Sequence, residues 1–263
     1  MDLQLKGKLA FISGSTKGIG RAIAEALLKE GARVIVNGRS NTAAVVEELR
    51  KIGDAEGIDG DVSDATQAEE MCQKIASFGD LDILVNNMGT FTPQKFEEIS
   101  DQDWMEIFEK NVLSTIRLSR FFFPKMLERD FGRVIHIASE AGLRGLESMV
   151  HYSTTKGAQV VIGRGMANLT LGSGKNVTVN SILPGPTMTE GVKEWLKERA
   201  EYEGMAVEEF VSKFFKETEP NSLLQRFIRP EEVANTVAYL ASPLSSAING
   251  TALRVEGGLI KHI

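Results

Sequence analysis

The chain has one cysteine, Cys72, among its 263 residues, so it cannot form an intrachain disulfide. Disulfides form and persist in oxidising compartments, so a chain without them is compatible with a reducing compartment. We therefore expect a cytoplasmic protein. No run of Lys and Arg occurs, and a net charge of −6 argues against a nucleic-acid partner. The apolar stretch at the amino terminus is too short for a secretion signal or a membrane span, so no membrane partner is expected either.

Histidine is also scarce. His136, His151 and His262 are far apart in the sequence, whereas a zinc site usually needs closely spaced histidine, cysteine or carboxylate ligands. We therefore expect no metal site. His136 falls within an apolar run and is expected in the core, and the position of His151 beside Tyr152 leaves a substrate contact open.

Short apolar runs rich in Val and Ile predict buried strands, at residues 9–13, 33–38, 81–87, 132–139 and 177–185. Helical spacing of apolar residues predicts helices at residues 20–31, 42–53, 70–79 and 230–242. This alternation of strand and helix predicts the α/β class, with a Rossmann-like doubly wound parallel sheet. No linker, repeat or low-complexity tract divides the chain, so we expect a single domain over residues 1–263.

Residues 186–227 are much longer than the usual connection in an α/β domain. The stretches 194–202 and 207–217 have the pattern of amphipathic helices. Taken alone, this segment fits either a surface helical hairpin or a mobile lid over a ligand site.

The stretch "SGSTKGIG" puts Gly14, Gly18 and Gly20 between the first predicted strand and the first predicted helix. Glycines at such a place let the backbone approach a pyrophosphate, whose charge lies at the helix amino terminus. The spacing G-x-x-x-G-x-G differs from the standard G-x-G-x-x-G fingerprint. The position after the first strand nevertheless predicts dinucleotide binding.

The second predicted strand ends in "VIVNGRS" and lacks the acidic residue that binds the adenosine ribose in NAD enzymes. Gly38 stands where that acid is expected, Arg39 follows it, and Lys17 lies in the glycine loop. A 2′-phosphate attracts cations, whereas a free ribose diol prefers a carboxylate. These residues therefore predict NADP as the cofactor in preference to NAD.

In "HYSTTK", Tyr152 and Lys156 lie one helical turn apart, where side chains at i and i+4 meet. An aromatic ring packed along an aliphatic stem would give the same pattern. An ammonium beside a phenol would instead lower the pKa of the phenol and allow proton exchange near neutral pH.

Seven motifs decide between these interpretations, because they occur in the order known from one family: "SGSTKGIG", "DGDVSD", "LVNNMG", "EKNV", "IAS", "YSTTK" and "ILPGP". Over nearly its whole length the chain resembles the classical short-chain dehydrogenase/reductases. The resemblance implies a catalytic tetrad of Asn111, Ser139, Tyr152 and Lys156. Tyr152 would exchange the proton, Lys156 would lower its pKa and bind the nicotinamide ribose, Ser139 would hold the reacting oxygen, and Asn111 would position a relay water.

The same resemblance implies a set of cofactor-binding residues along the predicted strand ends. These are Gly14, Ser15, Thr16, Lys17, Gly18, Ile19, Gly20, Arg39, Asp61, Val62, Asn87, Gly89, Tyr152, Lys156, Pro184, Gly185 and Thr187. It also implies that residues 186–227 form a substrate lid, since the family keeps its substrate loop after the nicotinamide turn.

The implied activity is hydride transfer between NADP(H) and the alcohol or ketone group of a small molecule. Acidic residues in the lid segment, with aromatics such as Trp195, Phe210 and Phe214, predict an apolar rather than an anionic substrate. A 3-oxoacyl-[acyl-carrier-protein] reductase is an alternative; it would need basic residues at the mouth of the site, for which Arg129 and Lys175 are candidates. A non-catalytic dinucleotide-binding regulator is a second alternative, against which the intact tetrad argues.

The resemblance further implies a homotetramer or a homodimer, assembled through helices near residues 103–128 and 153–171. The apolar run "FFF" and the small residues Gly157, Ala158 and Gly163 would allow close packing of such helices.

Overall fold

The apolar runs form the expected parallel sheet in a computed structural model of the chain, which describes residues 1–262. The sheet has seven strands in the order β3-β2-β1-β4-β5-β6-β7, and all neighbouring strands are parallel. The strands are β1 (Leu9–Ile12), β2 (Arg33–Gly38), β3 (Ala55–Asp59), β4 (Ile83–Asn86), β5 (Gly132–Ile137), β6 (Val177–Pro184) and β7 (Ala252–Val255). The strand order reverses between β1 and β4, and in open α/β sheets ligands bind outside the carboxyl ends of the strands at such a switch point.

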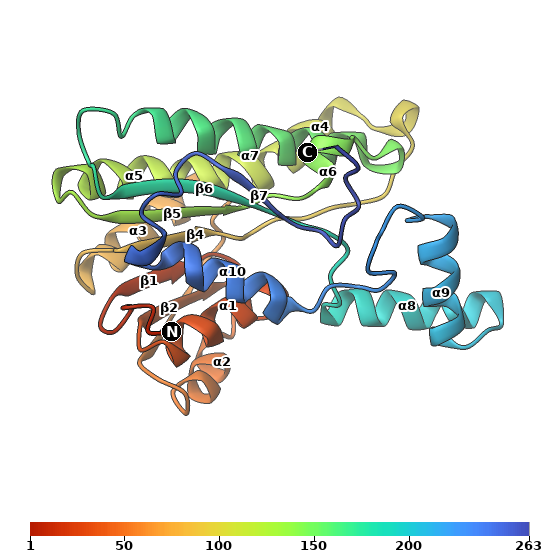
Figure 1. Cartoon of the computed structure of the whole chain (residues 1–263), viewed down its shortest axis with the longest axis horizontal. Coiled ribbons are helices and arrows are strands. Elements are labelled where there is room, and N and C mark those ends of the chain that lie inside the picture. Colours follow the sequence, from red (N-terminus) through yellow and green to blue (C-terminus); the bar gives the residue numbers. More distant parts are fainter. Residues whose placement is uncertain (263) are drawn as a thin grey trace.

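Helices cover both faces of the sheet (Figure 1). One face carries α1 (Gly18–Lys29), α2 (Thr42–Leu49) and α10 (Pro230–Ala241). The other face carries α3 (Ala65–Ser77), α4 (Asp101–Phe108), α5 (Ser114–Glu128) and α7 (Val150–Asn168). Short helical turns complete the connections: α6 (Ala141–Arg144), η1 (Phe96–Glu98), η2 (Glu109–Leu113), η3 (Glu147–Met149) and η4 (Pro243–Ser245).

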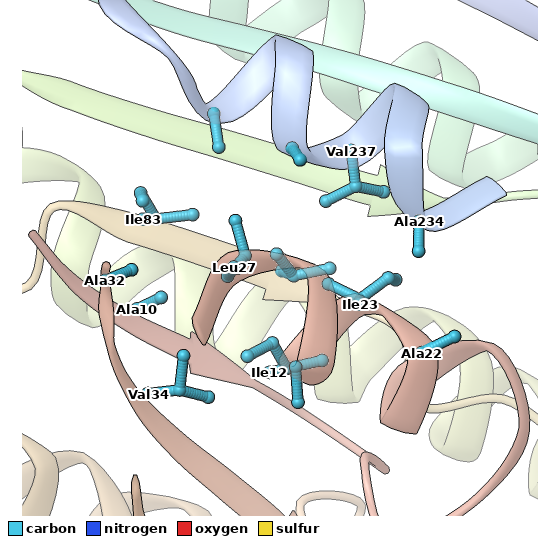
Figure 2. Close-up of a cluster of buried hydrophobic side chains, with 14 of the residues drawn as sticks. Ala10, Ile12, Ala22, Ile23, Leu27, Ala32, Val34, Ile83, Ala234 and Val237 are labelled. Carbon is cyan, nitrogen blue, oxygen red and sulfur yellow. The ribbon is translucent and has the colours of Figure 1, made fainter. Parts of the chain in front are cut away.

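Side chains of successive strand residues point into two separate cores, because they alternate between the two faces of the sheet. Ala10 and Ile12 of β1 enter the core under α1 and α10, whereas Phe11 enters the core on the opposite face. Figure 2 shows the first core, with Leu27 of α1 and Val237 of α10 turned toward the strands. Burial on both faces explains why the strands read as continuous apolar runs.

Two strands were absent from the sequence prediction, β3 and β7. Their sequences, "AEGID" and "ALRV", carry charged residues and lie at the two edges of the sheet, where only partial burial is needed. Helix α3 also begins earlier than the predicted residue 70. Asp64 caps it by accepting a hydrogen bond from the Gln67 amide, and such a side-chain cap fixes where a helix starts.

The long segment 186–227 contains the two helices expected of it, α8 (Glu190–Glu203) and α9 (Val207–Glu217). They form a hairpin that stands out from one end of the sheet (Figure 1). The hairpin has a small core of its own, made by Leu196, Ala200, Phe210, Phe215 and Phe227. Trp195 and Phe214 pack edge to face on this core, with ring centroids 5.9 Å apart. The aromatic residues of the segment thus hold the hairpin together.

One sheet, its covering helices and the attached hairpin account for residues 1–262, which form a single domain; residue 263, included in the predicted range, lies outside the described residues. Within residues 1–262 no helix combines the length and the apolarity that crossing a membrane requires.

Candidate active site

The carboxyl ends of β1, β4, β5 and β6 bring the predicted residues to one edge of the sheet. Ser13 follows β1, Asn87 follows β4, and Ser139 lies two residues after β5. Helix α7 crosses the same region and contributes Tyr152 and Lys156. The structure therefore brings together residues that the sequence separates by more than a hundred positions.

The Lys156 side chain is buried, and its Nζ has two protein acceptors. Nζ donates to the Ile137 carbonyl at 2.9 Å and to Gln159 Oε1 at 3.0 Å, and it lies 5.7 Å from the centroid of the Tyr152 ring. A Cβ at Gly89 would lie only 3.1 Å from Nζ. Glycine at position 89 thus leaves room for the ammonium beside the segment after β4.

Burial sets the pKa values of the pair. It raises the pKa of the Tyr152 phenol, although the hydrogen bond to Ser139 lowers it and nearby Glu140 adds to the rise. Burial also lowers the pKa of Lys156 to about 7. Desolvation thus dominates the pKa of Tyr152 in this structure, and the expectation that Lys156 lowers this pKa stays a prediction. Tyr152 is consequently protonated at neutral pH, which is the form that can donate a proton.

Asn111 lies in η2, a π-helical turn between α4 and α5. Its Nδ2 donates to the Thr90 carbonyl at 2.9 Å and to Thr155 Oγ1 at 3.0 Å, and its Oδ1 accepts from the Thr90 amide at 2.8 Å. Single π turns occur often at functional sites. Asn111 therefore ties the segment after β4 to helix α7.

Glu140, Arg144 and Glu219 form a charged chain next to Ser139 that the sequence analysis missed. The Ser139 hydroxyl donates to Glu140 Oε2, and Glu140 Oε1 lies 3.1 Å from Arg144 Nη2. Arg144 also makes two hydrogen bonds to Glu219, at 2.7 and 2.8 Å. Burial raises the pKa of Glu140. The i,i+4 spacing of Glu140 and Arg144 was visible in the sequence, but the link to Glu219, 75 residues away, was not.

The glycine loop has the tight geometry that dinucleotide binding requires. Gly14 and Gly18 adopt φ values of 61° and 58°, which favour glycine. A Cβ at Gly20 would collide with the Gly14 carbonyl oxygen. Asn87 fixes the loop, since its Nδ2 donates to the Ser13 carbonyl at 3.0 Å and to the Gly14 carbonyl at 2.8 Å. The loop therefore brings its backbone amides to the start of α1, where phosphate groups bind.

The amino terminus of α1 already holds a carboxylate. Gly18 donates its backbone amide to Glu190 Oε2 at 2.9 Å. Glu190 is the first residue of α8, so this bond joins the glycine loop to the helical hairpin. Thr189 packs against the same glycine, since a Cβ at Gly18 would lie 3.3 Å from its Cγ2.

The end of β2 has no room for a side chain. A Cβ at Gly38 would lie 2.6 Å from Thr16 Cγ2. Lys17 and Arg39 are exposed nearby, and neither makes an ion pair with the residues that the structure describes. The end of β2 thus offers cations but no carboxylate at the position predicted to meet the adenosine ribose.

The remaining predicted cofactor residues lie along the same strand ends. Asp61 Oδ1 accepts from the Ser63 amide and hydroxyl, and the Val62 side chain is buried in the core, so only main-chain atoms of Val62 remain for a ligand. A Cβ at Gly185 would lie 2.9 Å from Glu256 Cα. Thr187 Oγ1 donates to the Gly185 carbonyl at 2.8 Å. The functions of these residues stay predictions, as do those of Pro184, Ser15 and Ile19.

Between residues 1 and 262, no cluster of three His, Cys, Asp or Glu side chains could hold a metal ion.

Comparison with known proteins gives a consistent result. The model of the family described as enoyl-(acyl carrier protein) reductase matches residues 14–260. The uncharacterized oxidoreductase YvrD of Bacillus subtilis (strain 168) is 49% identical over 265 residues, covering 100% of both chains. The 3-oxoacyl-[acyl-carrier-protein] reductase FabG of Aquifex aeolicus (strain VF5) is 34% identical, covering 98% of this chain and 100% of the relative. The crystal structure of L-sorbose reductase from Gluconobacter frateurii, complexed with NADPH and L-sorbose, superposes with a TM-score of 0.94 at 30% identity, covering 100% of both chains.

Proposed function

The chain belongs to the classical short-chain dehydrogenase/reductase family, and from this premise we propose that it reduces the ketone group of a small polar molecule with NADPH. It is an oxidoreductase that transfers hydride at a CH–OH or ketone group. The observation that carries the proposal is the cluster of Ser139, Tyr152 and Lys156 beside a glycine loop at the carboxyl edge of the sheet.

In this proposal a nicotinamide dinucleotide supplies the hydride, and the protein supplies binding, orientation and proton transfer. Tyr152, protonated because burial raises its pKa, donates its proton to the carbonyl oxygen. Ser139, at the end of β5, holds that oxygen once its single hydroxyl donor turns from Glu140 to the substrate. Lys156 uses two of its three N–H donors on Ile137 and Gln159, which leaves the third for the cofactor ribose.

The choice of NADP over NAD rests on the end of β2. Gly38 supplies no carboxylate, a side chain there would crowd Thr16, and Arg39 and Lys17 offer positive charge for a 2′-phosphate. The NADPH complex of L-sorbose reductase supports the same choice.

A polar substrate is favoured by the surroundings of Ser139. Glu140, Arg144 and Glu219 lie on this side of the site. The aromatic side chains of the hairpin, which suggested an apolar lining, pack on one another instead. L-sorbose reductase is a structural neighbour, so we propose a hydroxylated carbonyl compound such as a ketose.

We propose the hairpin of α8 and α9 as the substrate lid. It follows the turn at residues 184–187 directly, and Glu219 after its second helix is bound to Arg144 next to the site. A cytoplasmic location and a homotetramer or homodimer complete the proposal.

A 3-oxoacyl-[acyl-carrier-protein] reductase is the second candidate, favoured by the identity with FabG. The basic residues suggested for carrier docking do not support it. Arg129 donates to the Leu81 carbonyl at 2.7 Å and lies 3.5 Å from Asp82, next to the start of β4. Lys175 precedes β6. Both residues thus lie toward the amino ends of the strands, opposite Ser139.

The test is NADPH oxidation against a panel of ketoses, apolar ketones and 3-oxoacyl thioesters, with Tyr152→Phe beside wild type. We expect a ketose to be reduced by wild type, and Tyr152→Phe to bind NADPH normally but lose at least ~10²-fold in turnover, the usual scale of general acid catalysis. Near-wild-type turnover in the variant would remove Tyr152 from the mechanism. Reduction confined to the thioesters would favour the second candidate, and normal NADPH binding without turnover of any compound would favour a regulator.

A further inference from the structure

Gln159 is a fully buried polar residue one turn beyond Lys156 on α7. Its side chain bonds two of the predicted catalytic residues, Lys156 and Asn111, and also Thr115. Its Oε1 accepts from Lys156 Nζ at 3.0 Å, and its Nε2 donates to the Asn111 carbonyl at 2.9 Å and to Thr115 Oγ1 at 3.0 Å. The side-chain amide therefore bridges the ammonium and the π-helical turn directly.

The Asn111 carbonyl has its acceptor capacity filled by protein groups. It accepts from Gln159 Nε2 at 2.9 Å and from Thr115 Oγ1 at 3.2 Å. A carbonyl oxygen has two lone pairs, so a relay water could bind there only by displacing one of these donors. In this chain the Asn111 carbonyl and the Lys156 ammonium are therefore linked through the Gln159 side chain.

The same bridge fixes the direction of the ammonium. Nζ has three N–H donors. The Ile137 carbonyl and Gln159 Oε1 accept two of them, and the lack of a side chain at Gly89 leaves space for an acceptor of the third. A hydrogen bond to an ionised group is worth more than one between neutral groups, so Gln159 Oε1 also stabilises the charged form of Lys156.

We propose that Gln159 is a positioning residue, whose amide links Asn111 to Lys156 and aims the Lys156 ammonium at the cofactor ribose. This inference rests on the proposed function, since it assumes that the groove binds a dinucleotide. It adds a residue that acts through Lys156 and touches neither substrate nor cofactor itself.

Two variants of nearly the same size separate positioning from simple packing. Gln159→Leu removes the acceptor from Lys156, and Gln159→Glu keeps an acceptor and adds a negative charge. The other titratable groups around Lys156 are Tyr152 on α7 and His136 on β5. Burial raises the pKa of the first and lowers that of the second to about 4, so both stay neutral between pH 6 and 9. The 2′-phosphate of NADPH also titrates, with a second pKa of about 6, but equally for every variant. A difference in pH profile between wild type and the variants is therefore assigned to Lys156.

The measurement is the dissociation constant of NADPH, obtained by fluorescence titration between pH 6 and 9. We expect Gln159→Leu to bind NADPH roughly tenfold or more weakly at pH 7, the loss of one hydrogen bond to a charged group. Affinity for NADPH should decline as rising pH deprotonates Lys156. The midpoint of this decline should lie at a lower pH in Gln159→Leu than in wild type. In Gln159→Glu it should rise by on the order of one pH unit or more, because a carboxylate beside Lys156 raises its pKa.

Thr178→Val is the matched control, since it removes a buried hydroxyl on β6 away from the site; its NADPH affinity and pH profile should equal those of wild type. Thermal melting checks that all variants fold. Equal pH profiles in wild type, Gln159→Leu and Gln159→Glu, with NADPH bound by all three, would overturn this inference and leave the proposed function intact. Wild type that binds no NADPH would overturn both.

Discussion

Arg39 offers its charge at the end of β2, and Gly38 before it has no room for a competing acid. A substitution of Gly38 by aspartate would drive a Cβ to 2.6 Å from Thr16 Cγ2. The cleaner change at this site is therefore the removal of the cation, which leaves the backbone of the loop unchanged.

We predict that Arg39→Leu weakens NADP binding by about tenfold or more, because a charge-assisted hydrogen bond contributes on the order of 1.5–3 kcal/mol. NAD binding should be unaffected, since NAD lacks the 2′-phosphate. Titration of both cofactors decides this, with Lys51→Met as a control that removes an exposed cation at the far end of α2. Wild type that binds NAD as tightly as NADP would make Arg39 only a solvated cation.

His136 is a core histidine, as the sequence predicted, and it makes stability depend on pH. It is fully buried, its Nδ1 lies 3.1 Å from Asn86 Nδ2, and burial lowers its pKa to about 4. An unfolded histidine has a pKa of about 6.5, so between these values the unfolded chain binds a proton that the folded chain does not. Stability should fall as the pH drops from about 6.5 to 4. Below about pH 4 the contribution of His136 should not change further.

The contribution is on the order of 3 kcal/mol, at 1.36 kcal/mol for each pKa unit. Urea unfolding at pH 7, 5.5 and 4.5 measures it against His136→Gln, whose side chain does not titrate. We expect a smaller loss of unfolding free energy at low pH in the variant. The same loss in both proteins would show that other groups cause the acid sensitivity.

At the scale of elements, the first residue of α8 contacts the first residue of α1. Glu190 accepts the Gly18 amide at 2.9 Å, and Gly18 belongs to the loop proposed to hold the cofactor pyrophosphate. A carboxylate at a helix amino terminus is favourable, but it would compete there with a second anion. The start of the proposed lid and the cofactor thus share one donor.

We predict that Glu190→Gln binds NADP several-fold more tightly, because a repulsive charge is removed from the pyrophosphate position; a charge at a helix terminus is worth roughly 0.3–1 kcal/mol. Glu194→Gln, one turn further along α8 and also exposed, is the control for the loss of a negative charge. Weaker binding in Glu190→Gln than in Glu194→Gln would mean that the carboxylate assists the cofactor instead.

How far the sequence could be interpreted differs from element to element. The central strands and α1 were predictable because burial on both faces leaves continuous apolar runs. The edge strands β3 and β7 were not, because their partial burial permits Glu56 and Arg254 in them. The family motifs predicted the tetrad, and the roles of its residues stay predictions. Gln159 and Glu219 act through contacts formed only by folding, and no local spacing reveals that Gln159 reaches Asn111 across 48 positions.

For the whole molecule, two of the small residues expected to allow helix packing between subunits make contacts within the chain instead. A Cβ at Gly163 would lie 2.7 Å from Ser181 Oγ, so this glycine serves contact between α7 and the sheet. Gly157 likewise approaches the Gly142 carbonyl of α6. Val161 on α7 and Leu169, the residue directly after this helix, are exposed by 71% and 62%, so they stay available for a contact between subunits.

We predict a dimer or a tetramer in solution and a lower mass for Val161→Glu, because a charge at an apolar contact is costly to bury. Light scattering at micromolar concentration measures both, with Tyr202→Glu on the exposed surface of α8 as control. A wild-type mass near 28.8 kDa, that of one chain, would contradict the assembly.

The central claim is hydride transfer from NADPH to a carbonyl carbon, with Tyr152 donating the proton. Its most direct test uses NADPH deuterated at C4 of the nicotinamide on the transferring face, together with the ketose that wild type reduces fastest. Mass spectrometry of the alcohol should find one deuterium on the carbinol carbon with wild type, and at least ~10²-fold less deuterated alcohol per unit time with Tyr152→Phe. Alcohol that carries protium at that carbon, or deuterated alcohol formed equally fast by both proteins, would contradict the account.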